Sequence, residues 1–227
     1  LAQWKRIADV SEEFATSNLH LTTRQDIQIH FVSLDRTPEL WSLLERDNVT
    51  IREACGNTVR NVTASDQAGI DPDEPFDVTP YAHGVFEFFL RKPVCQDMGR
   101  KFKIAFSGCK ENPCGLVTMH DAGAIAKIKM VDGAPRRGFE FYVGGGLGSV
   151  PYKAKLFEVF LPEEELLPTL QAIARVYARL GEKRNRARAR IKFLIAHLGI
   201  EEFRRLVLAE RQTLPFDSRW SDYLSSI

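Results

Sequence analysis

The spacing of apolar residues changes along this 227-residue chain, and this change limits the possible folds more than any other feature. Between residues 101 and 143, apolar and polar side chains alternate, and turn-forming residues separate the segments, as in strands. After Pro162 the apolar residues recur at helical spacing, with breaks at Gly181 and Gly199. Strands followed by helices predict an α+β fold with a mixed sheet. The predicted strands cover residues 101–106, 116–120, 125–130 and 138–143.

The first 50 residues predict a smaller strand-and-helix unit. Apolar residues at helical spacing indicate a helix over residues 1–15. Residues 26–31 alternate between apolar and polar, which predicts a half-buried strand. Thr37 and Thr79 are each followed by proline, and we expect each threonine to cap a helix, with the proline in its first turn. The acidic, proline-rich residues 65–80 indicate a surface loop.

Charge and composition exclude several classes of protein. The 31 Lys and Arg nearly balance the 30 Asp and Glu, so the net charge of +1 gives no global attraction to nucleic acid. No apolar run is long enough for a membrane-spanning helix. Four cysteines are few for a disulfide scaffold and no secretory signal is visible, so we expect a cytoplasmic protein. The chain begins with Leu1 rather than Met, which suggests a processed or excised piece.

Two lysines share one face of the strand predicted at residues 101–106. Lys101 and Lys103 would lie about 7 Å apart, because a strand rises about 3.3 Å per residue. Such a pair repels itself and is favoured when an anion lies between the two charges. The alternative is a solvated strand edge, where lysine prevents aggregation. Spacing alone favours that alternative.

Two further polar groups could bind an anion. Arg24, Gln28 and His30 would share the polar face of a continuous strand, where together they could bind carboxylates or an oxyanion. The alternative is an ordinary outward face of a sheet. Gly56 and Asn57 allow a turn that would expose Arg60.

The glycine-rich residues 144–148 follow a predicted strand, but they do not form a nucleotide-binding loop. Ser149 replaces the third glycine of the G-x-G-x-x-G pattern, and Pro151 stands where a helix would already have begun. Consecutive glycines still allow the backbone to approach a flat ligand closely. We therefore expect close packing against a ligand here rather than phosphate binding.

A basic run extends from Arg175 to Lys192 with Glu182 as its one acid. Such a run indicates either a solvated helix face or an RNA-binding patch. Tyr177 and Phe193 lie among apolar residues and are expected in the core, which weakens the RNA interpretation. Cys109 and Cys114 do not have the spacing of a zinc knuckle, so no metal ligands are predicted.

Five motifs in this order resemble the siroheme-dependent nitrite and sulfite reductases. They are Leu-Thr-Thr-Arg-Gln (21–25) with its Gln-x-His strand, Asn-x-x-Arg-Asn-Val (57–62), Arg-Lys-Phe-Lys (100–103), Phe-Tyr-Val-Gly-Gly-Gly-Leu-Gly (141–148) and Asn-Arg-x-x-Ala-Arg-x-Lys (185–192). The resemblance implies a ferredoxin-like half-domain over residues 1–50. It further implies a mixed-sheet α+β siroheme-binding domain with C-terminal helices over 51–210, and a linker over 211–227 toward a second half.

The resemblance also assigns residues of four of these motifs to the site. Arg60, Lys101 and Lys103 match residues that face siroheme and bind the substrate anion, and Arg24 matches a contact to a siroheme carboxylate. His30, Asn57 and Arg100 lie in the matching motifs, and the backbone of Gly144, Gly145 and Gly146 matches a loop beside the macrocycle. Cationic side chains suit this chemistry, because siroheme carries eight carboxylates and the bound anion must lose oxygen as water.

The sequence departs from the family at several positions. The cysteine motif of the family's 4Fe-4S cluster, Cys-x5-Cys followed by Cys-x3-Cys, is absent, so we expect the cluster ligands in the second half. Gly99 stands where Pro is common, and Phe31 stands where Gly is common.

We therefore expect the siroheme-binding N-terminal half of an assimilatory-type oxidoreductase, inactive alone. The whole enzyme would reduce nitrite or sulfite with ferredoxin or a flavoprotein as electron donor. The alternatives are a non-catalytic tetrapyrrole- or anion-binding module and, less favoured, an RNA-binding protein.

Overall fold

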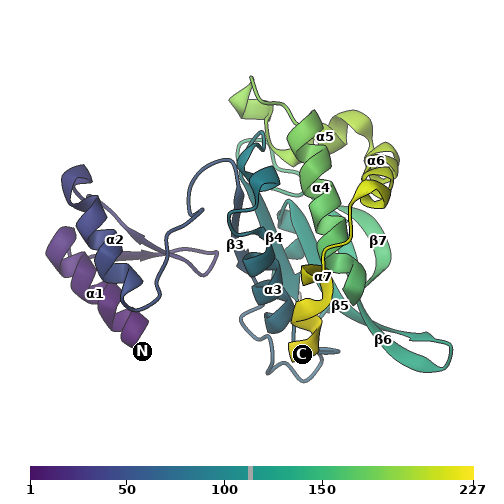
Figure 1. Ribbon diagram of the computed structural model, residues 1–227, viewed down its shortest axis with the longest axis horizontal. Helices are drawn as coiled ribbons and strands as arrows, with labels where there is room; N and C mark the ends of the chain where they lie inside the picture. The colour runs from purple at the N-terminus through teal and green to yellow at the C-terminus, as the bar shows by residue number, and fades with distance from the viewer. Residues whose placement is uncertain (112–114) are drawn as a thin grey trace. The chain divides into compact units, whose positions relative to one another are not determined.

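The computed structural model describes residues 1–111 and 115–227, and the chain forms two units, Leu1–Ala54 and Cys55–Ile227 (Figure 1). Each unit has a hydrophobic core of its own. Both units combine helices with a sheet, which confirms the α+β fold class expected from the sequence. Cys114, one of the cysteines considered above, lies outside the described residues.

The first unit packs two helices with a two-stranded antiparallel sheet. Its elements are α1 (Ala2–Phe14), β1 (Leu19–Leu21), β2 (Ile27–Ile29) and α2 (Thr37–Glu45), and a 3-10 turn, η1 (Leu34–Arg36), leads into α2. The core consists of Val10, Phe14, Leu40 and Leu44, and Ile29 of β2 packs against it. The predicted helix and strand are therefore confirmed, although the strand is shorter than expected.

The continuous strand expected through Arg24, Gln28 and His30 is wrong. Arg24 lies in the turn between β1 and β2, where the Thr22 N–H donates to the Asp26 carbonyl at 2.9 Å. The Thr22 Oγ1 also accepts hydrogen bonds from the N–H groups of Arg24 (3.3 Å) and Asp26 (3.2 Å). Threonine side chains that bond nearby backbone in this way favour a turn over a strand.

A five-stranded mixed sheet forms the centre of the second unit. Its strands are β3 (Val59–Thr63), β4 (Phe102–Ser107), β5 (Ala122–Val131), β6 (Ala134–Val143) and β7 (Lys155–Pro162), adjacent in that order. The first three strands are parallel, and β6 and β7 continue the sheet antiparallel. Phe102, Ile104 and Phe106 are fully buried, which confirms the inward face predicted for this strand.

Helices cover that inward face of the sheet (Figure 1). They are α3 (Thr79–Phe89), α4 (Leu166–Leu180), α5 (Ile191–Leu198), α6 (Ile200–Thr213) and the short α7 (Arg219–Asp222). Helices begin at Thr37 and Thr79 as predicted, but the threonines are the first helical residues rather than the caps. Trp220 is buried, and its indole N–H donates to Gln171 of α4 at 3.0 Å, so residues after α6 pack on the second unit.

The sequence missed some elements and misassigned one. The strand predicted at residues 116–120 is instead a 3-10 turn, η3 (Val117–Met119), that follows Leu116 at a φ of +52°. Val117 packs against Gly123 of β5, where a Cβ atom would overlap it. Strands β1, β3 and β7 were not predicted. None of the helices in the described residues is long and apolar enough to cross a bilayer.

Candidate functional site

The cationic residues predicted at the site share one face of the β3–β4 pair. Val59 of β3 lies opposite Phe102 of β4, and both side chains belong to the helix-covered core. Neighbouring residues in a strand point to opposite faces. Arg60, Lys101 and Lys103 therefore project from the face away from the helices, and each side chain is half-buried.

Lys101 lies within a group of positive charges. Burial lowers its pKa, and the guanidinium groups of Arg190, Arg60 and Arg100 lower it further, in that order. Asp121 opposes this effect. Within the described residues, the Lys101 ammonium has no hydrogen-bond or ion-pair partner. An anion at this position would relieve the repulsion among these cations.

Arg60 is held by the loop that leads into β3. Its Nε and Nη2 donate to the Gly56 carbonyl at 3.2 and 3.0 Å. Burial lowers the pKa of Arg60, an effect that Cys55 opposes and Arg100 reinforces. Asn57 follows Gly56 in this loop and is half-buried. Arg100 is also half-buried, and its backbone carbonyl accepts a hydrogen bond from the buried Tyr177 hydroxyl at 3.2 Å.

A buried ion pair lies beneath this cationic face. Asp121 is fully buried, and Arg190 donates to both of its oxygens, from Nε at 2.9 Å and from Nη2 at 2.7 Å. The Lys103 N–H donates to the same carboxylate at 2.8 Å. Burial raises the pKa of Asp121, and the Arg190 guanidinium opposes that rise. The sequence interpretation missed Asp121, although an acid beside an apolar strand needs a partner once it is buried.

The glycine loop lies against the start of β5. The Gly144 N–H donates to the Asp121 carbonyl at 2.8 Å, and the Gly145 N–H donates to the His120 carbonyl at 2.9 Å. A Cβ atom on Gly145 would lie 2.5 Å from the Thr118 carbonyl oxygen, and Gly144 has a φ of +82°. Both positions therefore require glycine. The close approach that these glycines allow is made to the backbone of residues 118–121, and the approach to a flat ligand stays a prediction.

Lys192 is buried and donates to the carbonyls of Leu147 (3.1 Å) and Val150 (2.6 Å). It thereby fixes the segment that follows Gly146. Other cations of the basic run also pair internally. Arg175 and Arg179 bind Glu210, each at 2.7 Å, and Lys183 binds Asp97 at 2.7 Å.

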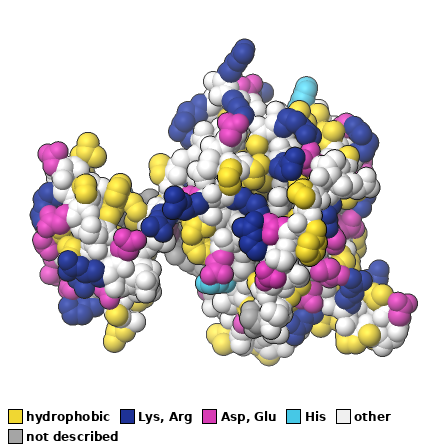
Figure 2. All heavy atoms as spheres, viewed as in Figure 1, with side chains coloured by type: hydrophobic (Ala, Val, Ile, Leu, Met, Phe, Trp, Pro, Cys, Tyr) yellow, Lys and Arg dark blue, Asp and Glu magenta, His cyan; other side chains and the backbone are white. Residues whose placement is uncertain are grey.

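Figure 2 shows basic and acidic side chains intermixed over the visible face rather than a single basic patch. Tyr177 is buried as predicted. Phe193 is not in the core: it is half-buried and lines a pocket of about 820 Å³ with Tyr152 and Arg188.

Two predicted site residues belong to the first unit. Arg24 is half-buried in the β1–β2 turn. His30 is exposed, and its ring packs edge-on to the ring of His20, with 5.8 Å between centroids. Phe31, which stands where glycine is common in the family, has a φ of +65° and is 85% exposed, and this left-handed conformation favours glycine.

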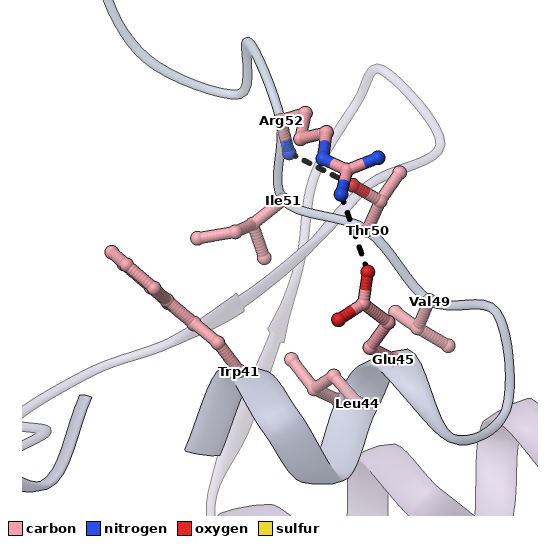
Figure 3. Close-up of a pocket in the computed structure, with 7 residues that line it drawn as sticks. All are labelled: Trp41, Leu44, Glu45, Val49, Thr50, Ile51 and Arg52. Atoms are coloured by element: carbon pink, nitrogen blue, oxygen red, sulfur yellow. Dashed lines mark hydrogen bonds and ion pairs between the residues drawn. The ribbon is translucent and has the colours of Figure 1, made fainter. Parts of the chain in front are cut away.

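The first unit also contains a pocket of about 370 Å³ beside α2 (Figure 3). Trp41 and Leu44 of α2 form one wall, and Ile51 approaches from the segment that follows. Arg52 pairs with Glu45 at its edge, at 3.2 Å. This pocket contains none of the residues predicted for the anion site.

The residues present suit a polycarboxylate better than a metal cluster. The half-buried cations around Lys101 would be stabilised by carboxylates. Within residues 1–111 and 115–227, no three His, Cys, Asp or Glu side chains are arranged to hold a metal ion.

Comparison with known proteins identifies the family. The family model for the nitrite and sulphite reductase 4Fe-4S domain matches residues 55–215, and the model for the nitrite/sulfite reductase ferredoxin-like half domain matches residues 1–47. The first of these matches covers most of the chain. The chain therefore belongs to the nitrite and sulfite reductase family, which confirms the resemblance found in the sequence.

Individual relatives agree with this assignment. The chain is 30% identical over 206 residues to a ferredoxin sulfite reductase of Mycolicibacterium paratuberculosis, and 35% identical over 214 residues to an assimilatory ferredoxin-dependent nitrite reductase of Haloferax mediterranei. These matches cover 91% and 89% of this chain, but 36% of each relative. The chain thus spans little more than a third of the curated relatives it matches.

Solved structures show the same similarity. The Mycobacterium tuberculosis NirA protein matches 95% of this chain and 38% of its own, with a TM-score of 0.84 and 31% identity. Dissimilatory sulfite reductase I matches 95% of this chain and 68% of its own, with a TM-score of 0.74. At 11% identity, the second match supports the fold alone.

Proposed function

We propose that this chain forms the siroheme-facing and substrate-binding part of a nitrite or sulfite reductase. Such an enzyme reduces nitrite to ammonia, or sulfite to sulfide, with six electrons. One observation carries the proposal: Lys101 lies among Arg60, Arg100 and Arg190, and Asp121 alone among its strongest charged neighbours opposes them. Family membership and the ferredoxin-dependent names of the relatives support the reaction class and a ferredoxin donor.

The chain's own residues would bind and orient the anion. Arg60, Lys101 and Lys103 present positive charge on one sheet face, where they would neutralise nitrite or sulfite and donate hydrogen bonds to its oxygens. The lowered pKa of Lys101 makes its proton easier to give to a departing oxygen. Siroheme, when bound, would supply the iron and pass on the electrons that the ferredoxin donor provides.

Several residues would hold siroheme. We assign its carboxylates to the cationic side chains, and we propose that its flat face lies beside the backbone of the glycine loop. The proposed residues are Arg24, His30, Asn57, Arg100, Gly144, Gly145 and Gly146. The ligands of a 4Fe-4S cluster are proposed to come from a further part of the enzyme.

A siroheme-loading experiment tests this proposal. The chain is co-expressed with the enzymes of siroheme synthesis, purified, and examined by visible absorption and iron analysis. We expect bound siroheme, with a several-fold lower content in Arg100→Gln. Arg186→Gln is the matched control, because it removes the same charge from an exposed position of the basic run. A chain that never binds siroheme, or equal loading of both variants, would contradict the proposal.

A non-catalytic tetrapyrrole- or anion-binding module is the second candidate. It rests on the same group of positive charges around Lys101, which would bind an anion whether or not a reduction follows. Turnover distinguishes the two candidates. The siroheme-loaded chain is mixed with the C-terminal part of a relative, and the reduction of nitrite and sulfite is measured. No reduction of either anion would favour the second candidate.

A further inference from the structure

Asp121 connects three parts of the second unit. Its carboxylate accepts from the Lys103 N–H at the start of β4 and from both Nε and Nη2 of Arg190, which directly precedes α5. Its backbone carbonyl accepts from the Gly144 N–H of the glycine loop. One buried residue thus joins the lysine-bearing strand, the glycine loop and Arg190.

Arg190 is confined on a second side by the glycine loop. A Cβ atom at Gly146 would lie 3.0 Å from the Arg190 Nη2, so the loop leaves just enough space for the guanidinium. The Arg190 side chain is 15% exposed. Of the charged groups that act on Lys101, Arg190 has the largest effect. Arg190 is therefore held close to Lys101 with little freedom to move.

We propose that Asp121 and Arg190 are a positioning pair for the anion site. The carboxylate fixes the Lys103 end of β4 and the glycine loop, and it holds the Arg190 guanidinium beside Lys101. The pair acts through its neighbours rather than by contact with the substrate. This inference rests on the proposed function in one respect: it takes the group of positive charges around Lys101 to be an anion site.

The two members of the pair act on Lys101 with opposite sign. The charged groups that face Lys101 are Arg60 from β3, Arg100 from the segment before β4, Arg190, and Asp121 from the segment before β5. Arg190 lowers the pKa of Lys101, and Asp121 raises it. If the ion pair only stabilised the fold, removing the charge of either Asp121 or Arg190 would let water reach Lys101. The pKa of Lys101 would then rise in both cases.

The test is a pH titration of Lys101 in the intact chain. Its 13Cε signal is followed by NMR in uniformly labelled protein and assigned with Lys101→Arg. We expect Arg190→Gln to shift the titration upward and Asp121→Asn to shift it downward. Arg190→Lys keeps the charge and should return the titration toward wild type. Arg184→Gln removes an exposed charge of the same loop and should leave it unchanged.

The outcomes separate this inference from the proposed function. Upward shifts in both Arg190→Gln and Asp121→Asn, or no shift in Arg190→Gln, would overturn the positioning pair. If Asp121→Asn fails to fold, the Lys101 titrations in Arg190→Gln and Arg190→Lys still test whether the Arg190 charge acts on Lys101. Sodium nitrite and sodium sulfite are then added to wild type, with sodium chloride as the control. No response of Lys101 to either anion, with the variant shifts intact, would count against the function alone.

Discussion

The glycine loop offers the sharpest test of the structure, because Gly145 faces backbone that cannot move aside. A Cβ atom at this position would lie 2.5 Å from the Thr118 carbonyl oxygen and 2.6 Å from that of His120. Overpacking of this kind costs about 1–3 kcal/mol. Displacing the loop also breaks the bond from the Gly145 N–H to the His120 carbonyl, worth about 1 kcal/mol. Gly145→Ala should therefore lower the free energy of unfolding by about 2–4 kcal/mol.

Calorimetry measures this loss directly. A protein of this size loses about 2–4 °C in melting temperature per kcal/mol, so Gly145→Ala should melt about 5–15 °C lower. Gly148→Ala is the matched control in the same loop. Gly148 has a φ of +106° and nothing within 4 Å of a Cβ, so the variant should lose only about 1 kcal/mol from backbone strain. Equal losses in the two variants, or an unchanged melting temperature in Gly145→Ala, would refute the reasoning.

Three further predictions concern other parts of the chain. Gly99→Ala places a Cβ against the Glu182 carbonyl and should lower the free energy of unfolding by about 1–3 kcal/mol. Hydrogen exchange in residues 182–189 should become faster, and unchanged exchange there would contradict this prediction. Phe31→Gly removes a side chain at a φ of +65° and should raise the free energy of unfolding by about 1 kcal/mol in urea titrations, whereas a decrease would show that the side chain stabilises the first unit. Burial lowers the pKa of Lys92 to about 8, so the unfolded state holds this proton more tightly, and the free energy of unfolding should rise between pH 8 and 10.5. Urea titrations should show a smaller rise in the free energy of unfolding over this pH range in Lys92→Met than in wild type. The same pH dependence in the two proteins would exclude Lys92 as the source of the rise.

The inward face of β4 could be predicted because its pattern is unambiguous. Phe102, Ile104 and Phe106 alternate with smaller or charged residues, and the structure buries all three. Strand β7 lacks this contrast. Phe157 and Leu161 face the core, but Leu156 and Phe160 on intervening positions are also apolar. Alternation is therefore weak in β7, and local pattern alone does not reveal it.

The turn at residues 117–119 shows a different limit. Five residues that include Leu116 and Val117 resemble a short strand, and so short a run does not distinguish strand from turn. Leu116 adopts a left-handed conformation that no local signal indicates. The decisive contact comes from Gly123, where the missing side chain admits Val117. Tertiary packing determined this element.

The basic run shows why a local excess of charge is a poor guide to a binding surface. Arg179, Lys183 and Arg190 find acids that are 31, 86 and 69 residues away in the sequence. The fold thus neutralises much of a segment that contains only Glu182 as an acid. Around Lys101 the outcome is the reverse. Its strongest charged neighbours are three guanidinium groups and one carboxylate, and that carboxylate is already bonded to Arg190. The proposed anion site thus lies where the fold leaves positive charges unbalanced, and not in the segment where the sequence places most of them together.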